Sequence, residues 1–236
     1  MNDMSSNILL IAHRGASNIA PENTLKAFQK AIDLKADYVE FDVHQSMDGE
    51  LIVIHDPNTF RSTGHNGSIK KMTLPEIKEL NAGEGEQIPT LEELIKLAKG
   101  KIGLQLEIKA SGIAQKIVNA LRNANLIDST IISSFIHKEL SEVQKIEPNA
   151  KIAALIVGIR KNKTLQKAID NKFGYIHPQY KTIKKSFIDA AHENNIMVNA
   201  WTVDGRDDME KLIAMGIDGI ITNDIELAKE VLNRNE

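Results

Sequence analysis

The chain of 236 residues contains no cysteine, which excludes disulfide bonds and thiolate metal sites. Any metal ion must therefore be bound through oxygen or imidazole ligands. Basic residues are not in excess, with 29 lysines and arginines against 32 aspartates and glutamates. The net charge of -3 gives no sign of a nucleic-acid-binding surface, which is usually strongly basic. With 42% hydrophobic residues, the composition is that of a globular protein with a substantial core.

Long hydrophobic runs are also missing. No apolar run approaches the ~18 residues that suggest a membrane-spanning helix, so we expect no stable insertion into a membrane. The first residues, MNDMSSNILLIAHRG, lack a basic region, and their apolar run covers only Ile8 to Ala12. This pattern argues against a signal peptide, and we therefore expect a cytoplasmic protein.

Short β-rich runs alternate with amphipathic helical patterns along the chain. Strands are predicted at 8–13, 38–43, 51–55, 101–109, 130–135, 151–157, 175–177, 196–203 and 219–222. Alternation of this kind indicates an α/β fold with a parallel sheet. The number of strands is one more than a (β/α)₈ barrel uses.

The pair Asp48-Gly49 accounts for the additional strand, because it is a strong signal for a two-residue hairpin. Residues 51–55 would then fold back on the preceding strand and leave eight βα units. We therefore predict a single domain over residues 1–236, a TIM (β/α)₈ barrel with a small inserted hairpin and loop region at about 44–90, after the second strand. A doubly wound open sheet is the alternative, but no glycine-rich dinucleotide fingerprint follows the first strand.

Acidic side chains alternate with apolar ones in two predicted strands. Glu40 and Asp42 share one face of the second strand, and Glu107 and Lys109 share one face of the strand at 101–109. Inward side chains at the carboxyl ends of barrel strands form the active site. Three acids against two cations, Lys109 and Arg14, favour a hard divalent ion with oxygen ligands: Mg²⁺ or Ca²⁺, with Mn²⁺ also compatible. The simpler alternative is that the acids pair only with these two cations.

Two histidines are expected beside the carboxylates. His13 ends the first strand, in the stretch LLIAHRGAS. With Asp48 and Gly49 as the hairpin residues, His55 falls opposite Asp42, and directly opposed residues share a face. A slip of one residue would turn His55 away. Paired histidines suit a reaction that deprotonates an attacking oxygen and protonates a leaving one.

Arg14 and Gly15 directly follow His13. The planar guanidinium fork suits a phosphate, and glycine lets the backbone approach a ligand closely. The tripeptide HRG therefore indicates a corner that binds an anion and transfers protons. Of the other histidines, His44 is expected beyond the barrel rim, and His177 is a candidate for the substrate mouth or for a supporting role.

Seven short motifs are spread over nearly the whole chain. The motifs HRG (13–15), PENT (21–24), EFDV (40–43), HD (55–56), EIK (107–109), WTV (201–203) and GIDGIIT (216–222) appear in order. The sequence resembles the glycerophosphodiester phosphodiesterases, most closely the short cytoplasmic bacterial type. Each motif alone is a weak signal, and the ordered set is a strong one.

The resemblance implies a TIM barrel that hydrolyses glycerophosphodiesters, such as glycerophosphocholine or glycerophosphoethanolamine, to sn-glycerol 3-phosphate and an alcohol. The implied roles are metal binding by Glu40, Asp42 and Glu107, acid–base catalysis by His13 and His55, phosphate binding by Arg14 and Lys109, lining of the substrate mouth by Trp201, and support of the site by Glu22 and Asn23. Two positions depart from the residues frequent in the family: Asp204 follows WTV, and Asn223 follows GIIT.

Two alternative functions use nearly the same residues. A phospholipase-type phosphodiesterase or lyase would release a cyclic phosphate, and product analysis separates it from a hydrolase. A non-catalytic barrel that binds a phosphorylated metabolite would need a histidine or a metal-binding acid to be missing, and none is. The resemblance implies a small glycerophosphodiester as the partner, and the net charge of -3 gives no reason to expect nucleic acid.

Overall fold

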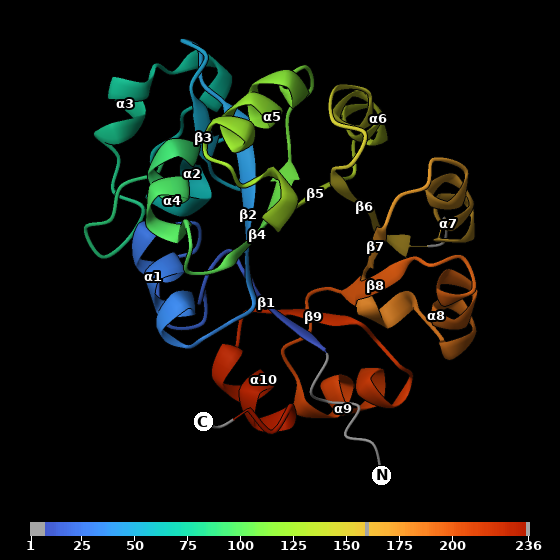
Figure 1. The fold of residues 1–236 in the computed structure, drawn as a ribbon. Helices are drawn as coiled ribbons and strands as arrows, with labels where there is room; N and C mark the ends of the chain where they lie inside the picture. The colour runs from blue at the N-terminus through green and yellow to red at the C-terminus, as the bar shows by residue number, and fades with distance from the viewer. Residues whose placement is uncertain (1–7, 159–160, 235–236) are drawn as a thin grey trace.

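The computed structural model describes residues 8–158 and 161–234, which form a barrel of strands surrounded by helices (Figure 1). The strands are β1 Leu9–His13, β2 Tyr38–Gln45, β3 Leu51–Val53, β4 Gly103–Ile108, β5 Thr130–Ser134, β6 Lys151–Ile156, β7 Tyr175–Pro178, β8 Met197–Ala200 and β9 Gly219–Thr222. They form one sheet in the order β1-β9-β8-β7-β6-β5-β4-β2-β3, and an additional pairing of β1 with β2 closes the ring. Pairs within the ring are parallel, whereas β3 runs antiparallel to β2 outside it. The predicted (β/α)₈ barrel is confirmed, as is the strand that folds back on its predecessor.

Helices follow the ring strands and cover the outside of the barrel. The helices are α1 Leu25–Asp33, α2 Phe60–Thr63, α3 Leu74–Lys78, α4 Leu91–Ala98, α5 Ala114–Asn123, α6 His137–Ile146, α7 Lys161–Asp170, α8 Lys185–His192, α9 Arg206–Ala214 and α10 Ile225–Val231, with short 3₁₀ turns at Ile69–Lys71, Ile127–Ser129 and Tyr180–Thr182. Within the described ranges, no helix is long and apolar enough to cross a lipid bilayer.

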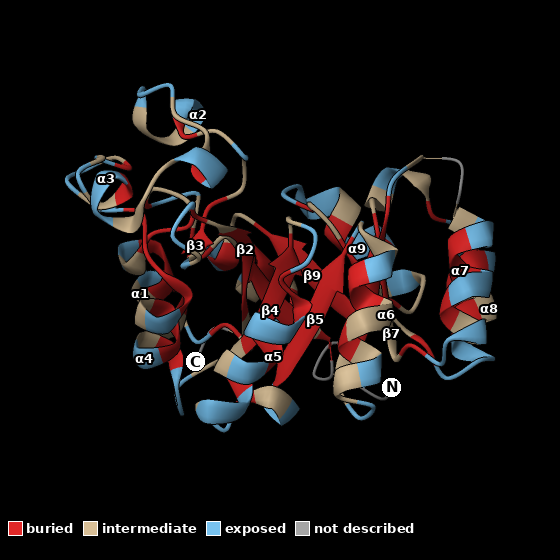
Figure 2. Ribbon diagram, turned by 90° about the horizontal axis from the view of Figure 1, so that it is seen from above, coloured by how far each residue is buried: buried red, intermediate tan, exposed pale blue. Residues whose placement is uncertain are grey.

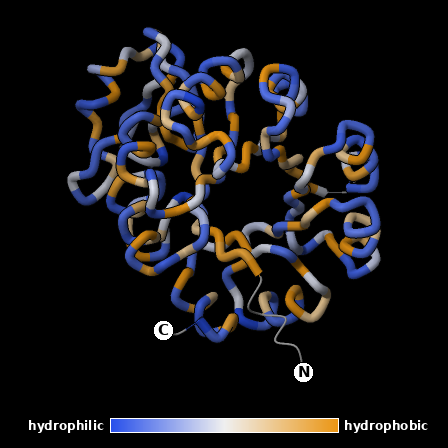
Figure 3. The backbone as a smooth tube through the Cα atoms, in the orientation of Figure 1, coloured by the Kyte–Doolittle hydropathy of each residue, from blue (hydrophilic) through white to orange (hydrophobic). Residues whose placement is uncertain are grey.

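The two faces of each ring strand differ in chemistry, as a period of two residues requires. Outward side chains such as Val39, Phe41 and Leu106 belong to the main hydrophobic cluster, which also includes the buried sides of the helices. Figure 2 shows this arrangement, with a buried ring inside helices that are exposed on their outer sides. Figure 3 shows hydrophobic positions along the strands of the ring and a mixture of hydrophobic and hydrophilic positions along the helices. Inward positions on the same strands carry buried polar groups such as Glu40 and Gln105. The alternation read from the sequence is therefore present in the barrel.

Capping residues determine where the helices beside the site begin. The Thr24 side chain accepts a hydrogen bond from Ala27 N at the start of α1. Thr90 and Glu93 form a capping box at the start of α4. The two helices pack against each other, which brings the loop before α1 and the end of the inserted segment to the same side of the barrel.

The segment between β2 and α4 forms an insertion with a small hydrophobic cluster of its own. The members of this cluster are Ile52, Ile54, Ile69, Ile77, Ala82 and Ile88. In Figure 2, α2 and α3 stand above one side of the ring. The insertion follows the carboxyl end of β2, so it lies at the end of the barrel where active sites form.

The hairpin between β2 and β3 differs by one residue from the predicted register. His44 pairs with Ile52, and the loop consists of residues 47–49 instead of two residues. Continued outward, this register does not place Asp42 opposite His55. The predicted pairing of those two residues is therefore wrong.

Hydrogen bonds within the loop explain its additional residue. Ser46 Oγ donates to Asp48 Oδ1 (2.6 Å) and accepts from Glu50 N (2.9 Å), while Ser46 N donates to Glu50 O (3.0 Å). Gly49 has a φ of +93°, the left-handed conformation typical of the last position in a three-residue hairpin. Asp48 also accepts from Leu74 N (3.0 Å), so its carboxylate ties the hairpin to α3.

Candidate active site

Three carboxylates come together at the carboxyl ends of β2 and β4. One oxygen each of Glu40, Asp42 and Glu107 lies within 4.8 Å of the others. The three residues are buried, with relative exposures of 4%, 1% and 7%. The parallel register pairs Asp42 with Glu107, so the alternation in the sequence places these acids on the same inner face.

Two cations face the three acids. Lys109 Nζ lies 2.9 Å from Glu107 Oε1 and 3.3 Å from Asp42 Oδ1, and Arg14 Nε lies 3.4 Å from Asp42 Oδ2. Burial and then the charge of Asp42 raise the pKa of Glu40 well above its usual range, and they raise the pKa of Glu107 to about 7. Burial acts in the same direction on Asp42, but Lys109 and Arg14 hold its pKa below the usual value.

The donor set fits a hard divalent cation, because all three groups offer oxygen atoms. Asp42 Oδ1 is buried without a hydrogen-bond partner. Burial and then repulsion among the acids raise the pKa values of Glu40 and Glu107, and a bound cation offsets both effects. Pairing with Arg14 and Lys109, the simpler alternative, is present but leaves this repulsion in place.

His13 ends β1 beside Glu40, with which it pairs in the parallel register. Its Nδ1 lies 2.7 Å from Asn223 Oδ1, and its Nε2 lies 4.0 Å from Glu40 Oε2. Ser17 Oγ donates to the same Asn223 oxygen (2.8 Å), and Asn223 Nδ2 donates to Asp204 Oδ2 (2.7 Å). An amide oxygen only accepts, so Nδ1 of the imidazole carries the proton and Nε2 is the acceptor. Burial, and then the charge of Arg14, lower the pKa of His13 to about 4.

His55 reaches the same place from the insertion. The strand β3 ends at Val53, so the side chain of residue 55 no longer follows the alternation of the sheet. His55 Nδ1 lies 2.5 Å from Asp56 Oδ1, and burial lowers the pKa of this imidazole. His44, expected beyond the rim, is instead a buried residue of β2 whose Nε2 lies 3.1 Å from His55 O.

One hollow of about 100 Å³ collects most of the predicted site residues. Its lining combines the polar residues His13, Arg14, Glu40, His55, Gln105, Glu107 and Lys109 with the apolar residues Phe135, Leu155, Trp201 and Ile221. The Phe135 ring packs edge-on against Trp201 with 5.8 Å between ring centres. The predicted place of Trp201 at the mouth agrees with this lining.

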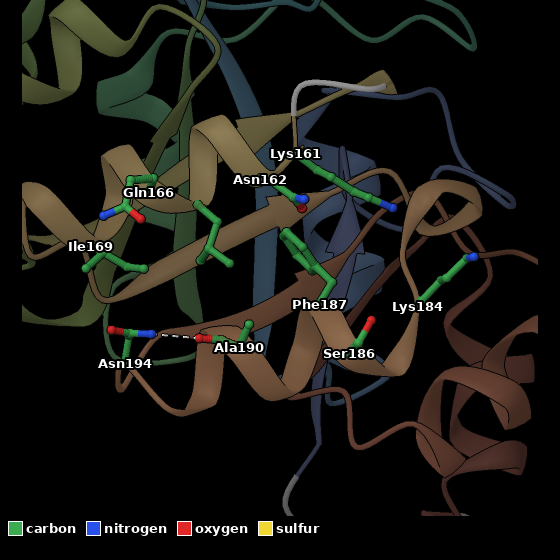
Figure 4. A pocket seen from close by; sticks show the side chains of 10 residues that line it. Lys161, Asn162, Gln166, Ile169, Lys184, Ser186, Phe187, Ala190 and Asn194 are labelled. Carbon is green, nitrogen blue, oxygen red and sulfur yellow. Dashed lines mark hydrogen bonds between the residues drawn. The ribbon is translucent and has the colours of Figure 1, made fainter.

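A larger hollow lies away from these residues. It is a groove of about 550 Å³ between α7 and α8, with Lys161, Lys184 and Phe187 in its lining (Figure 4). It contains no predicted site residue. The residue types in the lining therefore identify the candidate active site, whereas the volume of the hollow does not.

Glu22 and Asn23 support the site by direct hydrogen bonds. Arg14 Nη1 donates to both carboxylate oxygens of Glu22 (3.0 and 3.1 Å), and Asn23 Nδ2 donates to Asp42 Oδ2 (2.9 Å). Asn23 N also donates to Arg14 O (3.0 Å). The left-handed conformations of Arg14 and Asn23, with φ of +58° and +55°, bring these two corners together.

Gly15 lies directly against the backbone of α1. A Cβ atom added there would lie 2.7 Å from the backbone carbon of Ala27, and Ala16 N donates to Ala27 O (3.0 Å). The glycine therefore allows the HRG corner to approach α1. The expected close approach of the Gly15 backbone to a ligand stays a prediction.

His177 lies inside the barrel and not in the lining of the hollow. It is fully buried, burial lowers its pKa to about 3, and its Nε2 lies 3.2 Å from Asn199 Nδ2. The backbone oxygen of His177 accepts a hydrogen bond from Trp201 Nε1 (2.8 Å). The prediction of a substrate-mouth position is wrong, and the contact with Trp201 is a supporting one.

Sequence reasoning missed several residues around the hollow. Phe135, Leu155 and Ile221 line it from strand ends, where inner-face parity was the available signal. Arg61 on α2 forms ion pairs with Glu22 and Asp56, each at 2.7 Å. No motif or period in the sequence indicates those contacts.

Most of the chain is similar to known phosphodiesterases. The model of the glycerophosphoryl diester phosphodiesterase family matches residues 13–227. A glycerophosphodiester phosphodiesterase of Caldanaerobacter subterraneus subsp. tengcongensis is 40% identical over 231 residues, covering 92% of this chain and 95% of the relative.

Solved structures of this kind share the fold. An Oleispira antarctica phosphodiesterase in complex with the product sn-glycerol-3-phosphate matches with a TM-score of 0.89 at 26% identity, covering 98% of this chain and 99% of that one. A glycerophosphodiester phosphodiesterase from Thermotoga maritima matches with a TM-score of 0.83 at 27% identity, covering 94% and 98%. The fold and the site define a phosphodiesterase barrel. The chain belongs to the glycerophosphodiester phosphodiesterase family, and the predicted enzyme class, a phosphoric diester hydrolase, is confirmed.

Proposed function

We propose that the protein hydrolyses glycerophosphodiesters to sn-glycerol 3-phosphate and an alcohol, with a divalent cation bound by Glu40, Asp42 and Glu107. The observation that carries this proposal is the meeting of these three buried acids with two oriented histidines. Mg²⁺, Ca²⁺ and Mn²⁺ all accept such oxygen ligands. The cation would offset the negative charge of the phosphodiester and of the carboxylates around it.

Arg14 and Lys109 bind the phosphate in this proposal. Glu22 orients the Arg14 guanidinium through two hydrogen bonds, and Glu107 and Asp42 hold the Lys109 ammonium at the same end of the barrel. A guanidinium fork matches two phosphate oxygens, while an ammonium acts as a point charge. The two cations would therefore fix the phosphorus atom between the histidines.

The histidines divide the proton transfers. His13 Nε2 is the free acceptor, because the amide of Asn223 holds the proton on Nδ1, so His13 takes the proton from the attacking water. His55 is oriented by the Asp56 carboxylate, and an anionic partner stabilises an imidazolium better than an amide does. His55 therefore gives a proton to the departing alcohol. Water adds its oxygen to phosphorus, and the bond from phosphorus to the alcohol oxygen breaks.

Trp201 and Phe135 are proposed to contact the carbon atoms of the substrate at the mouth. Their edge-on packing gives the hollow an apolar surface beside the charged groups. The cytoplasmic location expected from the sequence stays a prediction, which fractionation of cells that produce the protein checks.

Product analysis in ¹⁸O-labelled water tests the proposal. Glycerophosphocholine, glycerophosphoethanolamine and glycerophosphoglycerol are incubated with protein that has been stripped of metal and then given Mg²⁺, Mn²⁺ or Ca²⁺. Labelled sn-glycerol 3-phosphate as the sole phosphorus product supports the hydrolase. A cyclic phosphate that persists would instead identify the lyase, and binding without turnover of any substrate would identify a non-catalytic barrel.

A further inference from the structure

A row of alternating charges joins His55, when it is protonated, to Arg14. His55 Nδ1 lies 2.5 Å from Asp56 Oδ1, and Asp56 Oδ2 accepts from Arg61 Nε at 2.7 Å. Arg61 Nη2 donates to Glu22 Oε1 (2.7 Å), which also accepts from Arg14 Nη1 (3.0 Å). The row therefore begins at the proposed proton donor and ends at the proposed phosphate-binding cation, with Arg61 at its centre.

Arg61 connects two parts of the chain that otherwise approach the site separately. Glu22 lies in the loop between β1 and α1, and Asp56 lies in the insertion after β3. The guanidinium uses different nitrogen atoms for the two carboxylates, Nε for Asp56 and Nη2 for Glu22. A single ammonium group lacks this geometry, so lysine is not an equivalent residue at this position.

Packing does not explain the position of α2. None of its residues is buried, and Phe60 is 62% exposed. The surrounding loop closes on itself, because Asn58 bridges to Ser68 and the Thr59 hydroxyl donates to His65 O (2.6 Å). Among the hydrogen bonds of the described residues, the one from Arg61 to Glu22 links α2 to the loop between β1 and α1.

We propose that Arg61 is a positioning residue of the phosphodiesterase reaction. By bonding to both Asp56 and Glu22, it holds the His55 imidazole and the Arg14 guanidinium toward one phosphodiester. This inference rests on the proposed function. An exposed ion pair contributes little to stability, and the Arg61 side chain is 44% exposed, so its effect belongs to the rate of the reaction.

Kinetics with two leaving groups form the first test. We expect Arg61→Met to lower kcat about 10- to 100-fold with glycerophosphocholine, part of the ~10²–10⁴-fold that general acid–base catalysis supplies. A p-nitrophenyl phosphodiester needs little protonation to leave, so its kcat should fall only a few-fold. Arg61→Lys, which keeps one contact, should recover only part of the loss.

A matched control and a double variant sharpen this test. Arg206 forms a comparable exposed ion pair with Glu230 on the outside of the barrel, with 46% of its side chain exposed, so Arg206→Met should leave both rates unchanged. If Arg61 acts on His55 through Asp56, adding Arg61→Met to Asp56→Asn should cost little more than the worse single change. Equal losses with both leaving groups, or a full additive loss in the double variant, would overturn the proposal.

Nitrogen NMR of the histidines gives a second readout that needs no turnover. Above pH 8, wild-type His55 should show a single tautomer with the proton on Nδ1, as the contact with Asp56 requires. In Arg61→Met this signal should broaden or become a mixture of tautomers, while the His13 signal stays unchanged. An unchanged His55 signal contradicts the positioning role even if the protein hydrolyses none of the substrates. If the His55 signal changes in Arg61→Met but the wild-type protein hydrolyses none of the substrates, the proposed function is refuted. The positioning of His55 by Arg61 is then still supported.

Discussion

The ring and the insertion line the same hollow, but they hold their residues in different ways. The ring supplies Glu40 and Glu107, whose side chains are 5% and 9% exposed and which lie on regular strands. The insertion supplies His55, whose side chain is 31% exposed and follows a strand of three residues. The two ring carboxylates are buried as well as hydrogen-bonded, whereas the partly exposed imidazole depends on its contact with Asp56. Exposed ion pairs are screened by salt more than buried ones. High salt should therefore weaken the contacts of the insertion more than those of the ring.

Removal of divalent ions tests the part that the ring supplies, and it should have the largest effect. Without a divalent cation, the phosphodiester would meet three acids that Arg14 and Lys109 balance only in part, so turnover should fall below detection. Mg²⁺, Mn²⁺ or Ca²⁺ should restore it, and circular dichroism should show an unchanged fold. Full activity in a preparation shown by elemental analysis to contain no metal would refute the metal site.

Replacing each histidine compares the contribution of the ring, through His13, with that of the insertion, through His55. His13→Ala and His55→Ala should each lower kcat about 10²- to 10⁴-fold with glycerophosphocholine. The double variant should be little worse than the worse single one, because the two groups act as a unit. A p-nitrophenyl substrate should rescue His55→Ala and leave His13→Ala slow. Rescue of His13→Ala alone would reverse the two roles.

Arg14→Lys tests the residue that directly follows β1 and ends the row of charges. Lysine keeps the positive charge but loses the fork that contacts Glu22 and that is proposed to bind the phosphate. We expect kcat/KM to fall about 10- to 100-fold, the range for hydrogen bonds to charged groups. Lys185→Met, which removes an exposed ion pair with Asp189, serves as the control. Wild-type kcat/KM in Arg14→Lys would make Arg14 peripheral.

Glu107→Gln provides the last comparison, which concerns the stability of metal-free protein and not its activity. In the folded protein without metal, burial and then the charge of Asp42 raise the pKa of Glu107 from the usual 4.5 to about 7. Between these two pH values the folded state therefore binds more protons than the unfolded state. The stabilisation present below pH 4.5 is therefore lost as the pH rises through about 7, by up to about 3 kcal/mol. Glu107→Gln should flatten that part of the curve in urea unfolding of metal-free protein. An equally steep fall in the variant would contradict this cause.

The ring residues could be predicted from the sequence because a strand has a strict period. Glu40, Asp42 and Glu107 alternate with apolar residues, and a parallel register carries that alternation from strand to strand. Their meeting in the barrel follows from the fold class alone. The same reasoning failed for the hairpin, where Ser46 and Asp48 form a hydrogen-bonded loop with one more residue than the signal Asp-Gly suggests.

The contacts of the loops could not be predicted in this way. Arg61 and Glu22 are 39 positions apart, and His13 and Asn223 are 210 positions apart. Neither pair follows a period, so only the folded chain brings them together. Asn223 was visible as a departure from the frequent residue, but its contact with His13 was not.

The separate hydrophobic cluster of the insertion makes this part of the enzyme a replaceable module. Its apolar residues pack with one another and do not belong to the main cluster. A graft that exchanges residues 57–87 would leave the ring chemistry intact while it reshapes the wall above the mouth, and with it the range of alcohols that can leave. Each graft would need an arginine able to reach both Glu22 and Asp56, and apolar side chains that cover Ile52 and Ile54.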